Sequence, residues 1–138
     1  MKRKIFRYFG LAAKITARKG NFDKRDYLLG SVGVRYDGAI VSAVNGSDKK
    51  RNRKIHSEYR LLNMIDHHAT VYIVRIRAGD ESLAMARPCP SCFKALISKK
   101  TKKIIYSIDD HHYGVINIKY SKNIKMKEYV KYSNKSLI

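Results

Sequence analysis

The sequence predicts an α/β fold, a three-layer α/β/α sandwich in which helices cover a mixed five-stranded sheet. Three observations predict it. Apolar residues near the N-terminus recur at helical spacing. Short β-branched segments then alternate with further helical segments along the chain. An Asp-Gly pair separates the first two of these short segments, which is a strong signal for a β-hairpin.

The first part of the chain predicts one helix and one hairpin. The helix spans residues 3–18, and a Gly-Asn pair follows it. Its apolar face is formed by Phe6, Phe9, Ala13 and Ala17. Residues 27–35 and 39–45 are predicted strands, because both are rich in apolar and β-branched residues. We therefore expect a helix that packs on a core, followed by two paired strands.

The middle of the chain predicts two helices with extended segments between them. The first helix starts at His56, and its apolar stripe consists of Tyr59, Leu62 and Ile65. A strand follows over residues 71–76, and residues 82–87 resume extended structure after a Gly-Asp turn. The second helix begins at Pro88 and fades at Lys99. One face of it carries Cys92, Ala95 and Leu96.

The last two predicted strands span residues 104–107 and 115–120. The link between them is too short for a crossover helix, so we expect them to be antiparallel neighbours. Residues 121–138 are predicted to form a polar, basic tail with weak helical periodicity. The whole chain, residues 1–138, is expected to be a single domain with its core at about residues 5–120.

The composition restricts the class of protein. The chain has 138 residues, with 30 Lys and Arg against 11 Asp and Glu, and a net charge of +19. Such an excess favours a polyanionic partner, because phosphate contacts release condensed counterions. The longest uncharged stretch, Gly38 to Ser47, is far shorter than the roughly 20 residues of a membrane-spanning helix. Two cysteines cannot make a disulfide framework, so we expect an intracellular, cytoplasmic protein.

Both cysteines lie in the segment Pro88-Cys89-Pro90-Ser91-Cys92. At the start of a helix, Cys89 and Cys92 are three positions apart and share a face. The unpaired N–H groups and the helix dipole at this end lower the pKa of a thiol, which favours the thiolate that a metal needs. The Cys-x-x-Cys spacing alone is compatible with a zinc site or with a redox pair.

A second motif decides in favour of zinc. His56-Ser57-Glu58 precedes the cysteines, and His-x-Glu followed by Pro-Cys-x-x-Cys is the signature of the zinc nucleobase deaminases. With His56, Cys89 and Cys92 as ligands, the fourth tetrahedral position stays open for water, as in a catalytic site. Two residues along a helix turn by about 200°. Glu58 therefore points away from His56 and can act as a base without binding the metal.

The chain resembles the cytidine and deoxycytidylate deaminase superfamily over about residues 5–120. Residues 28–46 (LLGSVGVRYDGAIVSAVNG) are similar to the first strand pair of that family, which ends in Asn-Gly before the His-x-Glu helix. The strand at 71–76, the PCPSC segment with its helix and the strand KIIYS follow in the family's order. The family often runs directly from the third strand into Pro-Cys, whereas residues 77–87 intervene here. The resemblance implies a cytidine deaminase-like fold and Zn²⁺ as cofactor.

The resemblance also implies a role for each matched residue. The zinc ligands would be His56, Cys89 and Cys92. Glu58 would take a proton from the activated water, pass it to the ring nitrogen N3 and help to protonate the departing ammonia. Asn45 would contact the sugar or hold the target base nearby. The backbone N–H of Ser57 would bind the carbonyl of the base.

Two basic regions bear on the substrate. A dense cluster leads directly into the His-x-Glu motif and consists of Lys49, Lys50, Arg51, Arg53 and Lys54. The end of the chain adds Lys119, Lys122, Lys125, Lys127, Lys131 and Lys135, opposed there only by Glu128. The resemblance implies cytosine as the target base. Two such basic regions favour single-stranded nucleic acid as the substrate, in which the target base must leave the stack to reach the metal. Free cytidine or deoxycytidylate is the alternative substrate, and the short link before the last predicted strand resembles that branch of the family.

Other interpretations stay open at this level. A non-catalytic nucleic-acid-binding protein could use the deaminase scaffold, although a purely structural zinc site has no use for Glu58. A thiol redox protein would have a disulfide between Cys89 and Cys92. A homo-oligomer is compatible with the family, whose members often complete one another's pockets. The pairs His67-His68 and His111-His112 flank predicted turns and are expected in loops.

Overall fold

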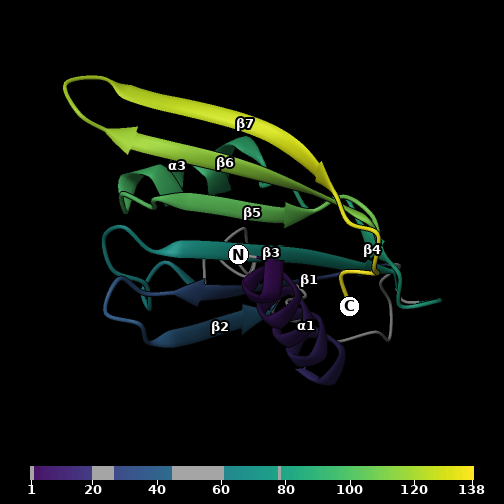
Figure 1. The fold of residues 1–138 in the computed structure, drawn as a ribbon. Helices are drawn as coiled ribbons and strands as arrows, with labels where there is room; N and C mark the ends of the chain where they lie inside the picture. Colours follow the sequence, from purple (N-terminus) through teal and green to yellow (C-terminus); the bar gives the residue numbers. More distant parts are fainter. Residues whose placement is uncertain (1, 20–26, 45–60, 78) are drawn as a thin grey trace.

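The computed structural model describes residues 2–19, 27–44, 61–77 and 79–138. Its elements are α1 (Lys2–Lys19), β1 (Tyr27–Val34), β2 (Ile40–Val44), β3 (Thr70–Arg77), β4 (Leu83–Ala84), α3 (Pro90–Ser98), β5 (Lys103–Ser107), β6 (His112–Tyr120) and β7 (Ile124–Tyr132). The α/β class predicted from the sequence is therefore confirmed (Figure 1). None of the helices in these ranges combines the length and the apolar character needed to cross a membrane.

The described strands form one mixed sheet. Their order is β2-β1-β3-β5-β6-β7, and β4 pairs with β3 outside this path. β3 and β5 run parallel, whereas the other neighbours are antiparallel. The antiparallel pairing of β5 with β6 confirms the expectation from their short link. The predicted number of five strands is wrong, because the described residues alone form a sheet of seven.

The two strands beyond the predicted five are β4 and β7. β4 arises from the segment 77–87 and adds an antiparallel pair to β3. β7 occupies the basic tail, for which weak helical periodicity was expected. It pairs with β6 along its whole length, from Ile124 opposite Tyr120 to Tyr132 opposite His112. Continuous pairing satisfies one side of the backbone and outweighs the helix propensity of the lysines in this segment.

Alternate residues of the central strand contribute to two buried clusters. Tyr72 and Val74 of β3 join Phe9 of α1 in one cluster. Ile73, which lies between them in the strand, joins Leu96 of α3 in the other cluster. In Figure 1, α1 lies in front of β1 and β3, and α3 lies behind β5 and β6. Because side chains alternate between the faces of a sheet, both faces are apolar where these helices pack.

The predicted apolar faces are confirmed in part. Of the predicted face of α1, Phe9 and Ala13 are buried, whereas Phe6 and Ala17 are half-buried. The buried face also includes Tyr8, Ala12 and Thr16. In the segment 61–65, Leu61 and Ile65 are buried, whereas Leu62 is only half-buried. The core contact there is thus made by Leu61 and Ile65, four residues apart, and not by the predicted pair Leu62 and Ile65.

Gly114 of β6 lets the Tyr106 ring cross over it from the neighbouring strand. The two residues are cross-strand partners, and a Cβ on Gly114 would lie 2.0 Å from Tyr106 Cζ. We expect Gly114→Ala to lower the free energy of unfolding by about 1–3 kcal/mol in a urea titration, because the added methyl group overpacks this site. Gly10→Ala is the control, since a Cβ there meets no atom within 4 Å and alanine favours the helix. Equal midpoints for the two variants would contradict this packing.

Candidate metal centre

The two cysteines lie at the start of α3, as the sequence predicts. Pro90 is the first helical residue, and Cys89 is the N-cap with φ −64° and ψ 160°. Proline is well tolerated there, because the first N–H groups of a helix have no partner within it. The Phe93 N–H donates to the Cys89 carbonyl at 2.8 Å and closes the first turn. The local sequence thus fixes where the helix begins and sets Cys89 and Cys92 about one turn apart.

The environments of the two sulfur atoms differ. Cys89 is exposed, and its Sγ lies 3.3 Å from the Ser91 hydroxyl. Cys92 is only 1% exposed and lies on the buried side of α3. The two sulfur atoms are not joined in a disulfide. Cys89 therefore lies at the protein surface, and Cys92 lies at the edge of the core.

The electrostatics of this helix start suit a metal. The first turn of α3 contains no acidic residue, so no carboxylate opposes the positive end of the helix dipole. The dipole and the N–H groups of this turn favour thiolates over thiols. Two thiolates spaced as Cys-x-x-Cys are preferred donors for Zn²⁺. The described donor set fits zinc.

The other predicted site residues lie outside the described ranges. They are Asn45, the basic cluster Lys49, Lys50, Arg51, Arg53 and Lys54, and the motif His56, Ser57 and Glu58. Within the part of the chain that the structure describes, no group of three or more His, Cys, Asp or Glu side chains could hold a metal ion. The ligand set of His56 with the two cysteines therefore stays a prediction.

The first described residues after Glu58 pack on the same side of the sheet as α3. Leu61 and Ile65 belong to the buried cluster that contains Leu96. Both lie over Gly33 of β1, where a Cβ would come within 2.7 Å of Ile65 and 3.3 Å of Leu61. The Ile65 N–H donates to the Leu61 carbonyl at 3.2 Å, as in a helical turn. The chain is thus on the α3 side of the sheet three residues after Glu58.

The two histidine pairs lie at turns or at the ends of elements, as the sequence predicts. His67 and His68 are exposed in the turn before β3. His112 begins β6, and its Nδ1 lies 2.8 Å from the Asp109 carboxylate. The Nδ1 of His111 lies 3.0 Å from a backbone carbonyl oxygen. These contacts give the second pair a structural role in the turn between β5 and β6.

A contact between β7 and the segment before the cysteines was not predicted. Arg87 forms a bidentate ion pair with Glu128, and its Nε and Nη2 each lie 3.0 Å from a carboxylate oxygen. The Tyr106 hydroxyl donates a short hydrogen bond to the same carboxylate. The Arg87 guanidinium also lies 5.7 Å from the centre of the Phe93 ring. β7 is therefore tied to the residue before the cysteine segment, and Arg87 in turn contacts Phe93, which follows it.

The network changes the acidity of its members. The hydrogen bonds from Arg87 hold the pKa of Glu128 below its usual 4.5, although partial burial opposes this. Burial, together with the hydrogen bond to Glu128, raises the pKa of Tyr106 to about 12. At neutral pH the network is therefore an ionised carboxylate held between a guanidinium group and a neutral phenol.

We expect Glu128→Gln to lower the free energy of unfolding at neutral pH by about 1 kcal/mol, because the pair is partly exposed. Folding lowers this pKa, so the ion pair stabilises the protein fully above about pH 4.5 and progressively less as the pH falls through the lowered value. In urea titrations the difference between wild type and variant should shrink on acidification. Glu81→Gln, at an exposed turn, is the matched control. A Glu128→Gln difference that stays constant into strong acid would contradict this account.

Comparison with known proteins identifies the family. The family model of the cytidine and deoxycytidylate deaminase zinc-binding region matches residues 4–108. The match includes both cysteines and ends just after β5, so β6 and β7 lie beyond it. No curated protein matches the chain significantly. The match confirms the resemblance and the expected cofactor: the chain belongs to the cytidine and deoxycytidylate deaminase family, and its cofactor is zinc.

Proposed function

We propose that this protein is a zinc-dependent hydrolytic deaminase that converts cytosine to uracil in single-stranded nucleic acid. The observation that carries the proposal is the cysteine pair at the start of α3, in a chain that the deaminase family model matches over residues 4–108. In the reaction, the C4–N bond of cytosine breaks and a C4–O bond forms from water. The amino group leaves as ammonia.

Each matched residue has one task in this proposal. The metal is held by His56, Cys89 and Cys92. When bound, zinc lowers the pKa of water to near 7, which supplies a nucleophile at neutral pH. The Glu58 carboxylate accepts a proton from the attacking water, delivers it to N3 of the ring and then assists protonation of the departing amine. Asn45 contacts the sugar or the base, and the Ser57 N–H binds the base carbonyl.

The described packing supports the proposed pairing of the two motifs. Leu61 lies only three residues after Glu58 and packs in the same buried cluster as Leu96 of α3. Ile65, one turn later, belongs to that cluster as well. We therefore expect the His-x-Glu motif to approach the cysteines from the sheet face that α3 covers.

The choice of a nucleic-acid substrate rests on charge. The net charge of +19 favours a polyanion, and the basic cluster at residues 49–54 directly precedes the His-x-Glu motif. Phosphates that flank a target base would meet this cluster. Free cytidine or deoxycytidylate is the second candidate substrate, favoured by the antiparallel pairing of β5 with β6. This pairing is the arrangement expected for the free-cytidine branch of the family.

Product analysis tests the proposal. The zinc-loaded full chain is incubated separately with cytidine, deoxycytidylate, and single-stranded DNA and RNA that contain cytosine, and uracil and ammonia are quantified. We expect uracil to form fastest in an oligonucleotide. Turnover of the free compounds alone would establish the second candidate. Absence of ammonia from all four substrates would show that the proposed function is wrong.

A further inference from the structure

The sheet face on the α1 side carries a row of lysines over β6 and β7. Tyr129 packs against the buried cluster of α1, which places this set of β7 side chains on that face. The Lys131 Nζ lies 5.5 Å from the centre of the Tyr129 ring. Lys119 of β6 is the register partner of Lys125 on β7 and shares its face. We define the lysine face as Lys119, Lys125, Lys127, Lys131 and Tyr129.

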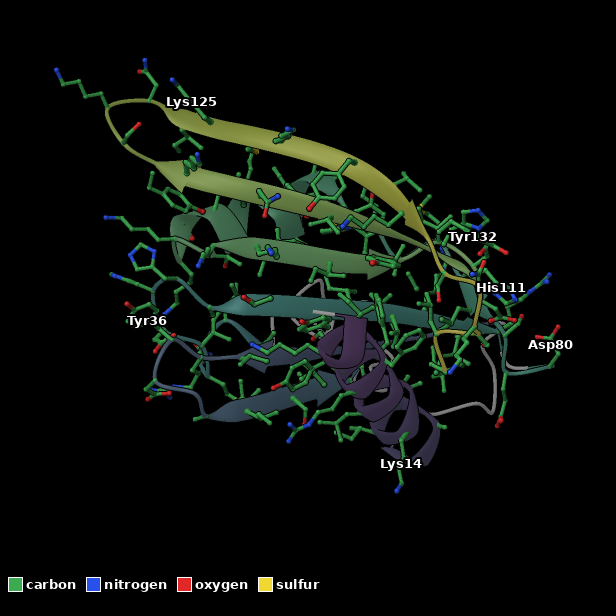
Figure 2. All side chains as sticks on the ribbon, in the orientation of Figure 1. Lys14, Tyr36, Asp80, His111, Lys125 and Tyr132 are labelled. Atoms are coloured by element: carbon green, nitrogen blue, oxygen red, sulfur yellow. The ribbon has the colours of Figure 1, made fainter. Side chains whose placement is uncertain are left out.

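The charge of the lysine face has one sign. Its lysines are exposed, and Figure 2 shows Lys125 directed into solvent near the tip of the hairpin. Among the described residues of β5, β6 and β7 the only acid is Glu128, which alternates to the opposite face and binds Arg87 there. Lysines at alternate positions of a strand are about 6.8 Å apart. This spacing is comparable to that of successive phosphates in an extended nucleic-acid strand.

A pocket of about 590 Å³ adjoins the lysine face where β7 ends. Its walls include the aromatic residues Phe6, Tyr113 and Tyr132 and the polar residues Ser133, Asn134 and Lys135. Tyr113 is the register partner of Lys131, so the pocket and the lysine face are continuous. Aromatic walls with a few polar groups at one end suit a nucleobase and its phosphate.

The wall of this pocket that follows β7 is fixed by the fold. The Ser133 N–H donates to the His111 carbonyl at 2.7 Å, and the Leu137 N–H donates to the Asp110 carbonyl at the same distance. Leu137 is buried in the core. Figure 2 shows His111 and Tyr132 close together at this end of the sheet, in agreement with their ring contact. The pocket is therefore formed before any ligand arrives, which reduces the entropy lost on binding.

We propose that the lysine face and this pocket form a second binding site, in which a single nucleic-acid strand lays its phosphates along the lysines and inserts one unstacked base into the pocket. The site is on the sheet face opposite α3 and the cysteines. It deepens the proposed function, on which it rests for the choice of a nucleic acid, because it would hold the strand that carries the target base. Lysines on an edge strand also hinder β-aggregation, but that role requires no aromatic pocket beside them.

Binding of a fluorescein-labelled oligothymidylate of about 20 nucleotides to the full chain tests this site. The probe contains no cytosine, so the deamination chemistry is not involved. The variant Lys125→Gln/Lys127→Gln/Lys131→Gln removes charge from the lysine face. We expect it to bind at least about tenfold more weakly. The slope of log affinity against log salt should also fall by about 2, since each phosphate contact on a single strand contributes about 0.7.

The matched control is Lys14→Gln/Lys94→Gln/Lys99→Gln. It has the same net charge as the first variant, but its lysines lie on α1 and at α3, and Lys14 is far from Lys125 in Figure 2. Lys14 and Lys94 are exposed, and Lys99 is half-buried at the end of α3. We expect it to retain the salt slope of the wild type and nearly all of its affinity. Equal losses of oligothymidylate affinity in the two triple variants would overturn the proposed site. They would show that binding depends on the net charge of the protein and not on the position of the lysines.

The pocket is tested separately at Tyr132, which is 63% exposed and can be changed without opening the core. Tyr132→Ala should weaken oligothymidylate binding by about tenfold through lost stacking, whereas Tyr132→Phe should bind as the wild type does. Equal binding by Tyr132→Ala and the wild type would overturn the pocket. Tighter wild-type binding to a duplex of the same length or to anionic phospholipid vesicles would overturn the assignment to single strands.

Cytidine turnover separates this inference from the proposed function. We expect both triple variants to deaminate free cytidine at the wild-type rate, because none of their lysines is assigned to the metal centre. If oligothymidylate binding depends on the lysine face but the protein deaminates no substrate, then only the proposed function is wrong. If the protein deaminates its substrate but the lysine-face variant binds oligothymidylate as the wild type does, then only this inference is wrong.

Discussion

Glu58→Gln is expected to lower the rate of ammonia release from the preferred substrate by about 10²–10⁴-fold, the range typical for a general acid–base. The carboxamide is nearly the same size as the carboxylate but cannot accept a proton at neutral pH. Zinc binding should persist, because Glu58 is a base and not a ligand in the proposed site. Ammonia release and zinc content, measured on the same preparation, test both statements.

Glu81→Gln is the control for this prediction, because it removes the same charge from an exposed turn. We expect it to retain wild-type activity and zinc. Equal rates for Glu58→Gln and the wild type would show that Glu58 does not transfer the protons. If neither protein releases ammonia from any substrate, the remaining interpretation is a nucleic-acid-binding protein on a deaminase scaffold.

The elements that the sequence predicts best are those whose burial follows a simple period. α1 has an apolar face at helical spacing, and Phe9 on that face is fully buried. β3 contains the continuous apolar run of residues 71–74, which is typical of a strand buried on both faces, and Val71 and Tyr72 enter opposite clusters. In both cases the residues that pack on the core are neighbours in the local pattern, so the sequence alone reveals them.

β7 is the strand that hydrophobic periodicity does not predict. Its residues alternate in the structure, with Tyr129 against the core cluster and Val130 exposed. Lysines occupy most positions of the first face, however, and apolar residues such as Met126 stand exposed on the other. This pattern is the reverse of the usual rule that apolar residues are buried, so hydrophobic periodicity could not indicate a strand. Only the pairing with β6 defines it.

The described part of the metal centre consists of the cysteine segment and of contacts that distant residues make with it. The sequence alone predicts mainly the cysteine segment. The start of α3 depends on Pro90 and its immediate neighbours, so the Cys-x-x-Cys geometry could be predicted. The ion pair of Arg87 with Glu128 joins residues 41 positions apart, and it depends on the register of β7. One signal could have indicated it: Glu128 is the only acidic residue after Asp110 in a lysine-rich segment.

Cys89→Ser is expected to remove zinc and activity together while the fold of the metal-free protein persists. Serine is among the preferred N-cap residues, so the helix should begin at Pro90 as before. Its hydroxyl stays protonated near neutral pH and is a poor substitute for a thiolate, because metal ligands must be deprotonated. We expect a loss of activity of at least about 100-fold, since even partners outside the ligand shell are worth 10–100-fold. Cys92→Ser is less informative, because it places a hydroxyl in the core.

Thermal unfolding with and without zinc separates the metal from the fold. A ligand that binds only the folded state stabilises it by about 4 kcal/mol at 1,000 times its Kd, so zinc should raise the Tm of the wild type by several degrees. Cys89→Ser should show no such increase, although the two metal-free proteins should unfold at similar temperatures. Lys94→Ala, an exposed position on the same helix, should respond to zinc as the wild type does. If Cys89→Ser keeps one zinc ion per chain and the full increase in Tm, then the start of α3 does not bind the metal, and the mechanism loses its only described ligands.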